Sequence, residues 1–149
     1  MWRCKMFIDE LIRKYEGCRL KAYPDPATGG LPITIGWGST KKPDGSNFAL
    51  GETISQDLAD ALLCNYIQKN IVPVFDKIPY KLTDNQKCAI ASLVYNVGVP
   101  AFTRSKLFTA ICKKDYAEIC RQWDFGYKQN LKGLFKRRTE ELYLFIKDI

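Results

Sequence analysis

Two carboxylates and a hydroxyl in the first quarter of the chain could together cleave a glycosidic bond. They belong to Glu16, Asp25 and Thr34. Such cleavage needs one acid to protonate the leaving oxygen and a second carboxylate to act on water or on the cation-like sugar. The spacing alone is not specific. Glu16 would also suit a surface position beside Arg13 or Arg19, Asp25 a turn between two prolines, and Thr34 an ordinary strand.

The residues before Glu16 predict a helix over residues 5 to 16. Apolar side chains recur there at the spacing of one helical face, at Phe7, Leu11, Ile12 and Tyr15. Gly17 follows directly and suits the left-handed cap that often ends a helix. Glu16 is then expected in the last turn, where the helix dipole disfavours a negative charge.

The next segments predict a small antiparallel sheet. Ala22-Tyr23 and Ile33–Ile35 are rich in β-forming residues, and the sequence between them, DPATGGLP, is dense in turn residues. Asp25 would lie in this turn and Thr34 in the second strand. Residues 36–52 favour a loop.

Helical patterns occupy the rest of the chain. Ser55 can cap a long helix that we expect to end before Pro73, with an apolar face that includes Leu58, Ala61, Leu62, Tyr66 and Ile67. Thr83 and Gln86 form a capping box for a helix through Tyr95, whose sequence CAIASLVY predicts a buried central helix. Further helices are expected at 103–112, 115–123 and 134–147.

These elements predict an α+β fold that is mainly helical, in a single domain over residues 1–149. A small lobe with a β-hairpin would span about residues 17–54. A larger helical lobe would comprise about residues 73–149 and the N-terminal helix. One long helix at about 55–72 would join the lobes, with a cleft between them.

Composition narrows the chemistry. The chain has no histidine, which excludes Ser-His and Cys-His nucleophiles. None of its six cysteines has CxxC spacing, so we expect no zinc site and reduced thiols.

The net charge of +7 favours polyanionic partners such as nucleic acid or the acidic bacterial wall. A basic nucleic-acid-binding domain is an alternative hypothesis, but no helix-turn-helix, RRM or zinc signature supports it. The tightest basic group, Lys136-Arg137-Arg138, is interpreted as a solvated helix face. The apolar stretches are too short to cross a bilayer, and the N-terminal residues do not match a signal peptide.

The sequence around the three candidate residues is more specific than their spacing. EGCRLKAYPD followed by TIGWGST closely resembles the opening signature of the phage-type lysozymes, a family of phage endolysins with a glutamate–aspartate–threonine triad. The matching residues, in order, are Glu16, Gly17, Arg19, Leu20, Ala22, Tyr23, Asp25, Thr34, Gly36 and Gly38. Two later blocks also match: Leu82–Gln86 leading to Tyr95–Gly98, Phe102 and Ser105, and then Trp123, Gly133-Leu134 and Arg137-Arg138. The resemblance covers about residues 6 to 145.

The resemblance implies a lysozyme-like fold and hydrolysis of the β-1,4 bond between N-acetylmuramic acid and N-acetylglucosamine in peptidoglycan. Glu16 would be the general acid, its proton retained by partial burial. Asp25 would act as base or stabilise positive charge, and Thr34 would place the attacking water. An inverting mechanism is expected, with the two carboxyl groups about 6.5–9.5 Å apart. No metal or organic cofactor is implied.

Several further positions follow from the resemblance but have structural alternatives. Substrate contacts are expected from Thr40, Tyr95, Asn96 and Ser105. The alternatives are loop polarity for Thr40, core packing for Tyr95 and helix capping for Ser105. Arg137 or Arg138 would pair with Glu16, and the helical period does not say which. Trp123 fits a core position better than a sugar platform.

Two departures from the family pattern affect the alignment. Eight residues separate Asp25 from Thr34, more than is common in the family, and a slipped alignment would make Thr28 a rival for the role of Thr34. Ser39 stands where several members carry histidine.

The biological setting is also inferred from the resemblance. A monomer is expected to accumulate in the host cytoplasm, without stable membrane insertion, and to reach the periplasm and cell wall through a separate pore-forming protein. A catalytically silent wall- or chitin-binding module on the same fold is the main rival. The sequence also leaves open whether the product is that of a hydrolase or a transglycosylase.

Overall fold

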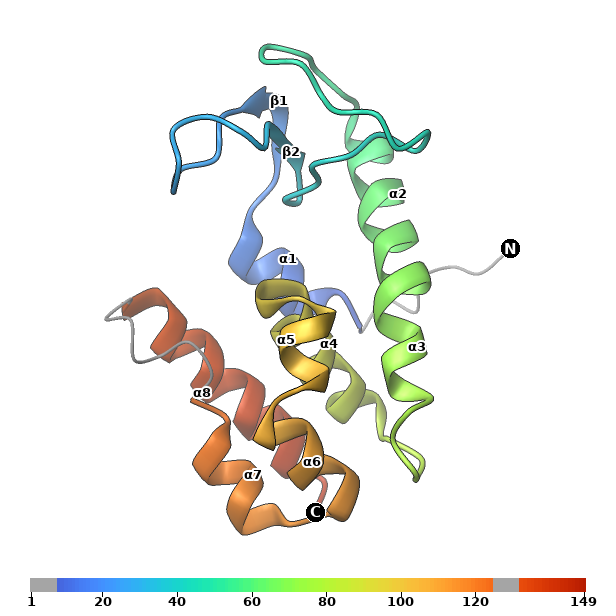
Figure 1. Cartoon of the computed structure of the whole chain (residues 1–149), viewed down its shortest axis with the longest axis vertical. Coiled ribbons are helices and arrows are strands. Elements are labelled where there is room, and N and C mark those ends of the chain that lie inside the picture. Colours follow the sequence, from blue (N-terminus) through green and yellow to red (C-terminus); the bar gives the residue numbers. More distant parts are fainter. Residues whose placement is uncertain (1–7, 125–131) are drawn as a thin grey trace. The chain divides into compact units, whose positions relative to one another are not determined.

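The computed structural model of this chain describes residues 8–124 and 132–149 (Figure 1). The elements are α1 (Glu10–Glu16), β1 (Arg19–Tyr23), β2 (Thr34–Gly36), α2 (Gln56–Tyr66), a π-helix (Ile67–Ile71), α3 (Val72–Phe75), α4 (Asp84–Val97), α5 (Val99–Thr103), α6 (Lys106–Lys113), α7 (Tyr116–Gln122) and α8 (Lys132–Ile146). The predicted mainly helical α+β class is confirmed. The chain divides into two compact units, Ile12–Ile67 and Met1–Leu11 with Gln68–Ile149. The single-domain interpretation with its lobe boundaries stays a prediction.

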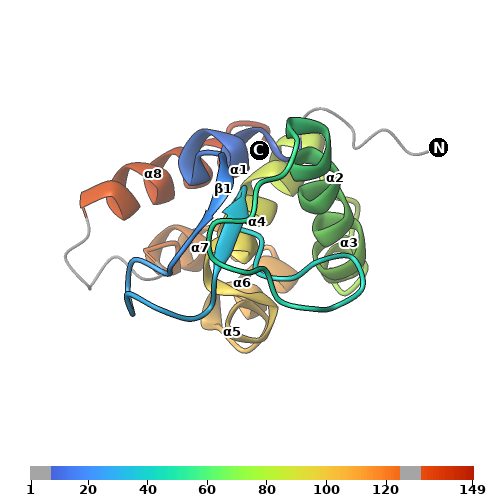
Figure 2. The ribbon, with the colours of Figure 1, turned by 90° about the horizontal axis from the view of Figure 1, so that it is seen from above.

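The first unit is built on a two-stranded hairpin. Gly17 ends α1 with a φ of +66°, the left-handed conformation expected there. β1 and β2 then pair antiparallel, as Figures 1 and 2 show, with Tyr23 opposite Thr34. The other edge of β1 is also paired, because Ile54 donates its N–H to the carbonyl of Leu20 at 2.9 Å.

The apolar core of this unit lies under the hairpin. It comprises Ala22, Ile35, Phe48 and Leu62, with Ile33 and Ile54 packed against them. Ser55 caps α2 as predicted, accepting the N–H of Leu58 at 3.1 Å.

The buried face of α2 differs from the predicted one. Buried residues are Ala59, Leu62, Leu63 and, just beyond the helix, Ile67, whereas Leu58, Ala61 and Tyr66 are exposed. The buried and the exposed faces of α2 both carry apolar residues, so the spacing of apolar residues could not show which face is buried. The contact with Gly36 indicates which face of α2 turns toward the sheet, because a Cβ added to Gly36 would lie only 3.3 Å from the Cβ of Ala59. The strand backbone thus packs directly on this side of the helix.

The prediction that this helix ends before Pro73 is confirmed, because α2 ends at Tyr66, but helical structure does not stop there. The helical path passes through the π-helix into α3, which contains Pro73 in its first turn. A proline is tolerated at that point because the first N–H groups of a helix have no partner within the helix. The same rule explains α5, which sequence analysis missed because Pro100 lies in its first turn. The helix expected at 103–112 instead begins at Lys106.

The central helix of the second unit is α4. Thr83 and Gln86 form the predicted capping box, with bonds of 3.1 and 3.0 Å. Residues Cys88 to Val94 are all buried, as their apolar composition predicted.

A buried carboxylate joins α8 to α4 and to the end of α7. Glu141 is fully buried and accepts hydrogen bonds from Ser92 Oγ at 2.7 Å and Trp123 Nε1 at 3.3 Å. Arg138 donates to both of its oxygens at 2.9 Å, and Arg137 donates to Oε1 at 3.2 Å. The interpretation of the basic group as a solvated face is therefore wrong for Arg137 and Arg138, which are 4% and 3% exposed.

Five cysteines lie in the described part of the chain, all as free thiols: Cys18, Cys64, Cys88, Cys112 and Cys120. Cys4 lies outside it. Cys88 is buried in α4, and burial raises the pKa of its thiol to about 11. Cys120 on α7 is exposed.

Loss of the buried carboxylate should destabilise the second unit strongly. In a Glu141→Gln variant two buried guanidinium groups would lose their counter-charge, so the free energy of unfolding should fall by about 3–5 kcal/mol. Urea unfolding followed by circular dichroism measures this change. Glu118→Gln is the control, because Glu118 pairs with Arg121 at the surface and its loss should matter far less. Equal losses in the two variants would contradict the structural role of Glu141.

The two contrasting thiols should differ in reactivity. Only the thiolate is alkylated, and at pH 8 a thiol with a pKa of about 11 is about a thousandth ionised. Native protein treated with iodoacetamide at pH 8 should therefore be modified at Cys120 and spared at Cys88. Peptide mass spectrometry reads out both sites, and denatured protein, in which both should react, is the control. Rapid modification of native Cys88 would contradict its placement in the core.

Candidate active site

The hairpin brings two of the three candidate catalytic residues to one end of the sheet. Thr34 is the first residue of β2 and lies opposite Tyr23, the last residue of β1. Asp25 follows Tyr23 by two residues, at the start of the connecting turn. This adjacency results from the strand register and not from closeness in sequence.

The turn itself orients the carboxylate of Asp25. Its Oδ1 accepts the backbone N–H of Ala27 at 2.8 Å, a local bond typical of aspartate in turns. The backbone closes the turn through the N–H of Gly29 on the Asp25 carbonyl at 2.7 Å. Asp25 is therefore a turn residue, which was the structural alternative to a catalytic role. Its carboxylate is half-buried, and the hydrogen bond from Ala27 to Oδ1 fixes the orientation of the group.

The hydroxyl of Thr34 is also oriented. Its Oγ1 donates to the carbonyl of Pro32 at 3.3 Å, which leaves the oxygen as an acceptor. Thr28, the rival position, donates to the carbonyl of Leu31 at 2.9 Å and accepts the N–H of Gly30 at 3.2 Å. Thr28 thus serves the turn, and the geometry favours Thr34 for any contact with water beside Asp25.

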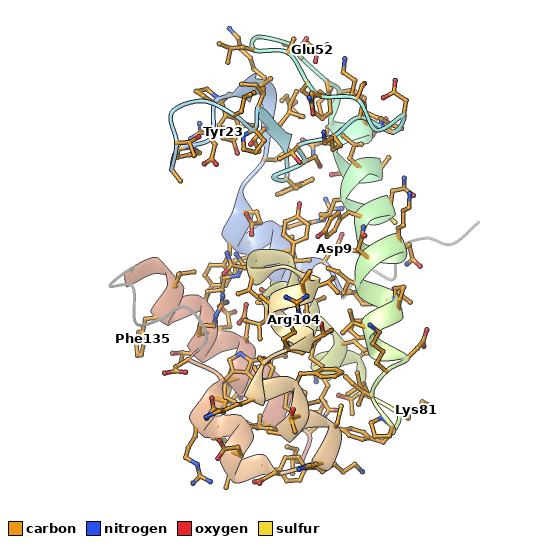
Figure 3. All side chains as sticks on the ribbon, viewed as in Figure 1. Asp9, Tyr23, Glu52, Lys81, Arg104 and Phe135 are labelled. Carbon is orange, nitrogen blue, oxygen red and sulfur yellow. The ribbon has the colours of Figure 1, made fainter. Side chains whose placement is uncertain are left out.

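Tyr23, labelled in Figure 3, ends β1 and is affected by the charges of several neighbouring residues. Burial raises the pKa of its phenol, the Arg19 charge lowers it, and the charges of Glu16 and Asp25 raise it further. The Arg19 guanidinium stacks on the ring at 4.6 Å from its centre. Both candidate carboxylates are therefore near enough to act electrostatically on one side chain. Sequence analysis noted Tyr23 only as a motif match, although its position two residues before Asp25 could have marked it.

Glu16 is the last residue of α1 and is half-buried. Arg13 donates to Asp60 at 2.9 Å, and Arg19 stacks on Tyr23. The partial burial expected for a proton donor is present.

The predicted substrate contacts fall in both units. Thr40 is half-buried in the loop after β2, and Tyr95 is half-buried near the end of α4. Asn96 is exposed and its side-chain oxygen accepts from Arg138 Nη2. Ser105 caps α6, accepting the N–H of Phe108 at 3.1 Å and donating to the carbonyl of Phe102 at 2.6 Å. Capping accounts for Ser105 locally, and sugar contacts by these four residues stay a prediction.

Trp123 is a core residue, as sequence analysis favoured. It is 1% exposed, its ring centre lies 5.1 Å from that of Phe145, and its indole N–H binds Glu141. Arg137 and Arg138 also bind Glu141. The pairing of one of these arginines with Glu16 stays a prediction.

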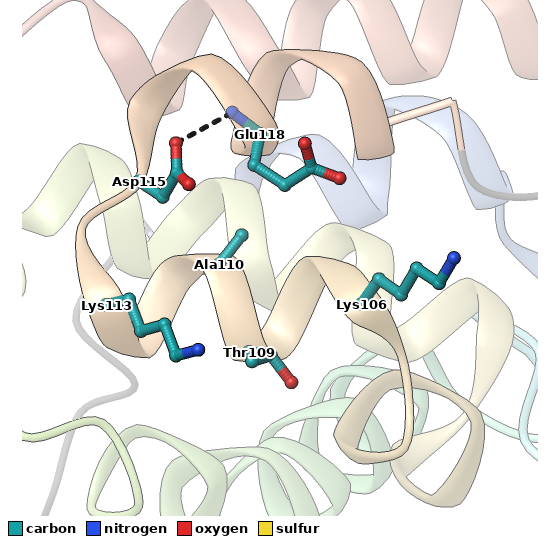
Figure 4. A pocket seen from close by; sticks show the side chains of 6 residues that line it. All are labelled: Lys106, Thr109, Ala110, Lys113, Asp115 and Glu118. Carbon is teal, nitrogen blue, oxygen red and sulfur yellow. Dashed lines mark hydrogen bonds between the residues drawn. The ribbon is translucent and has the colours of Figure 1, made fainter.

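The structure also has a pocket in the second unit, away from the hairpin residues in the sequence. It has a volume of about 240 Å³ between α6 and α7, lined by Lys106, Thr109, Ala110, Lys113, Asp115 and Glu118 (Figure 4). Within residues 8–124 and 132–149, no cluster of three or more cysteine, aspartate or glutamate side chains could hold a metal ion. No helix in the same ranges has the length and apolar character to cross a membrane.

Comparison with known proteins agrees with this geometry. Residues 13–141 match the family described as phage lysozyme. An endolysin of Acyrthosiphon pisum secondary endosymbiont phage 1 is 37% identical over 91% of this chain and 92% of its own length. The endolysin of Salmonella phage P22 is 36% identical, with the same coverage of both chains.

Solved structures are similar over nearly the whole chain. A mutant of P22 lysozyme superimposes with a TM-score of 0.77 at 30% identity, over 98% of this chain and 99% of the other. An endolysin from Escherichia coli O157:H7 phage FAHEc1 shares the fold with a TM-score of 0.83 at 23% identity, over 99% and 96% of the two chains. The half-buried glutamate, the hairpin with its aspartate and threonine, and these similarities lead to one conclusion: the chain belongs to the phage lysozyme family.

Proposed function

We propose that this protein degrades bacterial peptidoglycan by cleaving the β-1,4 bond between N-acetylmuramic acid and N-acetylglucosamine. One observation carries the proposal: the strand register sets Thr34 opposite Tyr23, which lies two residues before Asp25, at the end of the hairpin. A carboxylate and a hydroxyl that could act on water therefore lie near one end of the hairpin, and Glu16, the proposed acid, ends the helix that precedes it. Membership of the phage lysozyme family supports the same substrate class.

The proposed reaction has a single displacement. Glu16 gives its proton to the glycosidic oxygen, and the bond from that oxygen to the anomeric carbon breaks with its electron pair on the oxygen. Water attacks the opposite face of the sugar, and Asp25 takes the proton that the water loses. This geometry needs the carboxyl groups about 6.5–9.5 Å apart, so that a water fits between Asp25 and the sugar.

The local hydrogen bonds suit these roles. Asp25 Oδ1 is held by Ala27, which leaves Oδ2 for the water. Thr34 donates its own proton to Pro32 and can therefore accept one from the same water. A water that donates one hydrogen bond to Asp25 and one to Thr34 would direct a lone pair at the anomeric carbon. Tyr23, with its pKa raised above the usual 10, is neutral at physiological pH and adds no further charge.

The setting is also a proposal. Other relatives of this chain, from bacteriophage PS119 and Escherichia phage Mu, are named SAR-endolysins, so more than one kind of endolysin resembles it. We propose synthesis in the host cytoplasm as a monomer, passage through a separate pore-forming protein and action on the wall in the periplasm.

Replacement of the proposed acid should abolish lysis. Glu16→Gln keeps the size and polarity of the side chain but removes its proton, so clearing of a peptidoglycan suspension should fall at least about 10³-fold. Turbidity at constant enzyme concentration measures the rate. Glu10→Gln makes the same change at an exposed position of the same helix and should clear normally. Equal clearing by wild type and Glu16→Gln would remove Glu16 from the mechanism, and absence of clearing by the wild type would favour the silent wall-binding alternative.

The stereochemistry of the product tests the role of Asp25. Inversion at a β-linked sugar gives an α-configured reducing end first, which later equilibrates with the β form. Proton NMR within the first minutes of digestion should show the α-anomeric signal ahead of the β signal. An initial β signal would indicate a covalent intermediate on Asp25. Anhydro ends in mass spectra of the products would instead indicate attack by a sugar hydroxyl in place of water.

A further inference from the structure

One carboxylate on α2 gathers three donors from separate parts of the first unit. Asp60 Oδ1 accepts from Arg13 Nη1 at 2.9 Å, from Trp37 Nε1 at 2.8 Å and from Gln56 Nε2 at 2.9 Å. Arg13 belongs to α1, Trp37 is the residue directly after β2, and Gln56 begins α2. Asp60 therefore ties together the helix that ends in Glu16 and the strand that begins with Thr34.

The donors also contact one another. The Arg13 guanidinium lies 5.0 Å from the centre of the Trp37 ring, a stacking arrangement that adds a cation–π attraction. Arg13 and Asp60 are only about one-third exposed, at 34% and 37%, so their ion pair is partly shielded from water. The arrangement is a closed triangle of an acid, a guanidinium and an indole.

A second contact holds the chain just after Glu16. The side chain of Gln56 lies one helical turn before Asp60 on α2, and it contacts the Cys18 sulfur at 3.7 Å from Nε2. Asp60 and Gln56, one turn apart on α2, thus contact Arg13 and Cys18, which lie on either side of Glu16 in the sequence. Gly17 between them has the left-handed backbone that ends α1.

The charge on Asp60 is stable at working pH. Burial raises the pKa of its carboxyl, but the hydrogen bonds from Trp37 and Gln56 and the charge and hydrogen bond of Arg13 lower it below its ordinary value overall. Asp60 is thus ionised at neutral pH, and its bonds to Arg13 and Trp37 are charge-assisted and stronger than neutral ones.

We propose that Asp60 is a positioning residue for Glu16, fixing the C-terminal end of α1 against β2 through Arg13 and Trp37, with Gln56 supporting it through Cys18. The inference rests on the proposed role of Glu16 as the acid. A proton donor works only within hydrogen-bonding reach of the leaving oxygen, and a displacement of about 1 Å can cost about 100-fold in rate. Asp60 touches neither the substrate nor the reacting atoms in this scheme.

The test compares three variants of α2. Asp60→Ala removes the acceptor for all three donors, and Asp60→Asn keeps one acceptor oxygen without the charge. Asp57→Ala is the matched control, because Asp57 is an exposed aspartate on the first turn of the same helix. Thermal unfolding fixes a temperature at which every variant is folded, and kcat and KM are measured there on a defined peptidoglycan oligosaccharide.

We expect kcat of Asp60→Ala to fall about 100-fold with KM changed less than about threefold, and Asp60→Asn to lie between it and the wild type. A second substrate, the same sugar with a dinitrophenyl leaving group, distinguishes a displaced acid from a general loss of active-site structure. This group departs without a proton, so Asp60→Ala should cleave it within about threefold of the wild-type rate. If Asp60→Ala loses both substrates equally, or if Asp57→Ala loses as much, the inference is wrong. Should Asp60→Ala not fold, Asp60→Asn decides by the same comparison.

Glu16→Gln distinguishes failure of this inference from failure of the proposed function. Glu16→Gln should also cleave the dinitrophenyl substrate at close to the wild-type rate while failing on the oligosaccharide. If it is not rescued, Glu16 is not the acid and the proposed mechanism is wrong. If Glu16→Gln is rescued and Asp60→Ala is not, the mechanism stands and only the positioning role of Asp60 is lost.

Discussion

A carboxylate that accepts several fixed donors ties their elements together, and each unit of this protein contains one such group, fully buried in the case of Glu141 and partly exposed in the case of Asp60. In the first unit Asp60 collects donors from three segments far apart in the sequence. In the second, Glu141 collects Ser92, Trp123 and two arginines. An incompletely paired buried carboxylate costs several kcal/mol, so the cluster around the fully buried Glu141 strongly favours a single arrangement of its helices. Such specificity matters in an enzyme whose reacting groups must be held to within a fraction of an ångström.

The hairpin accommodates its long turn without disturbing the candidate site. Eight residues separate Asp25 from Thr34, and they are absorbed in a turn. The Gly29 N–H donates to the Asp25 carbonyl, the Asp25 N–H donates to the Gly30 carbonyl, and the hydroxyl of Thr28 bonds within the turn. The strand register still places Thr34 opposite Tyr23. Length variation in the turn therefore need not change the chemistry, because the turn projects beyond the paired residues.

The residues of the site differ in how many tasks they perform. Asp25 shapes its turn and carries a candidate catalytic carboxylate, and Ser105 both caps α6 and falls at a predicted substrate contact. A structural role thus does not argue against a chemical one, since the same hydrogen bond that stabilises a turn also orients the side chain. Tyr23 adds a neutral, half-buried ring on which the Arg19 guanidinium stacks, and the charges of Glu16 and Asp25 raise the pKa of its phenol.

The amino-acid sequence by itself determined the features that depend on near neighbours. The caps at Ser55 and Thr83, the left-handed Gly17 and the buried composition of α4 all follow from interactions within a few residues, and the signature around Glu16 identified the family. Only the tertiary structure decided which face of α2 is buried, that Arg137 and Arg138 lie inside the protein, and that Asp60 joins α1 to β2. These outcomes depend on partners distant in the chain. A periodic pattern says that a side chain can be buried, but only the packed partner, such as Gly36 against Ala59 or Ser92 against Arg137, decides that it is.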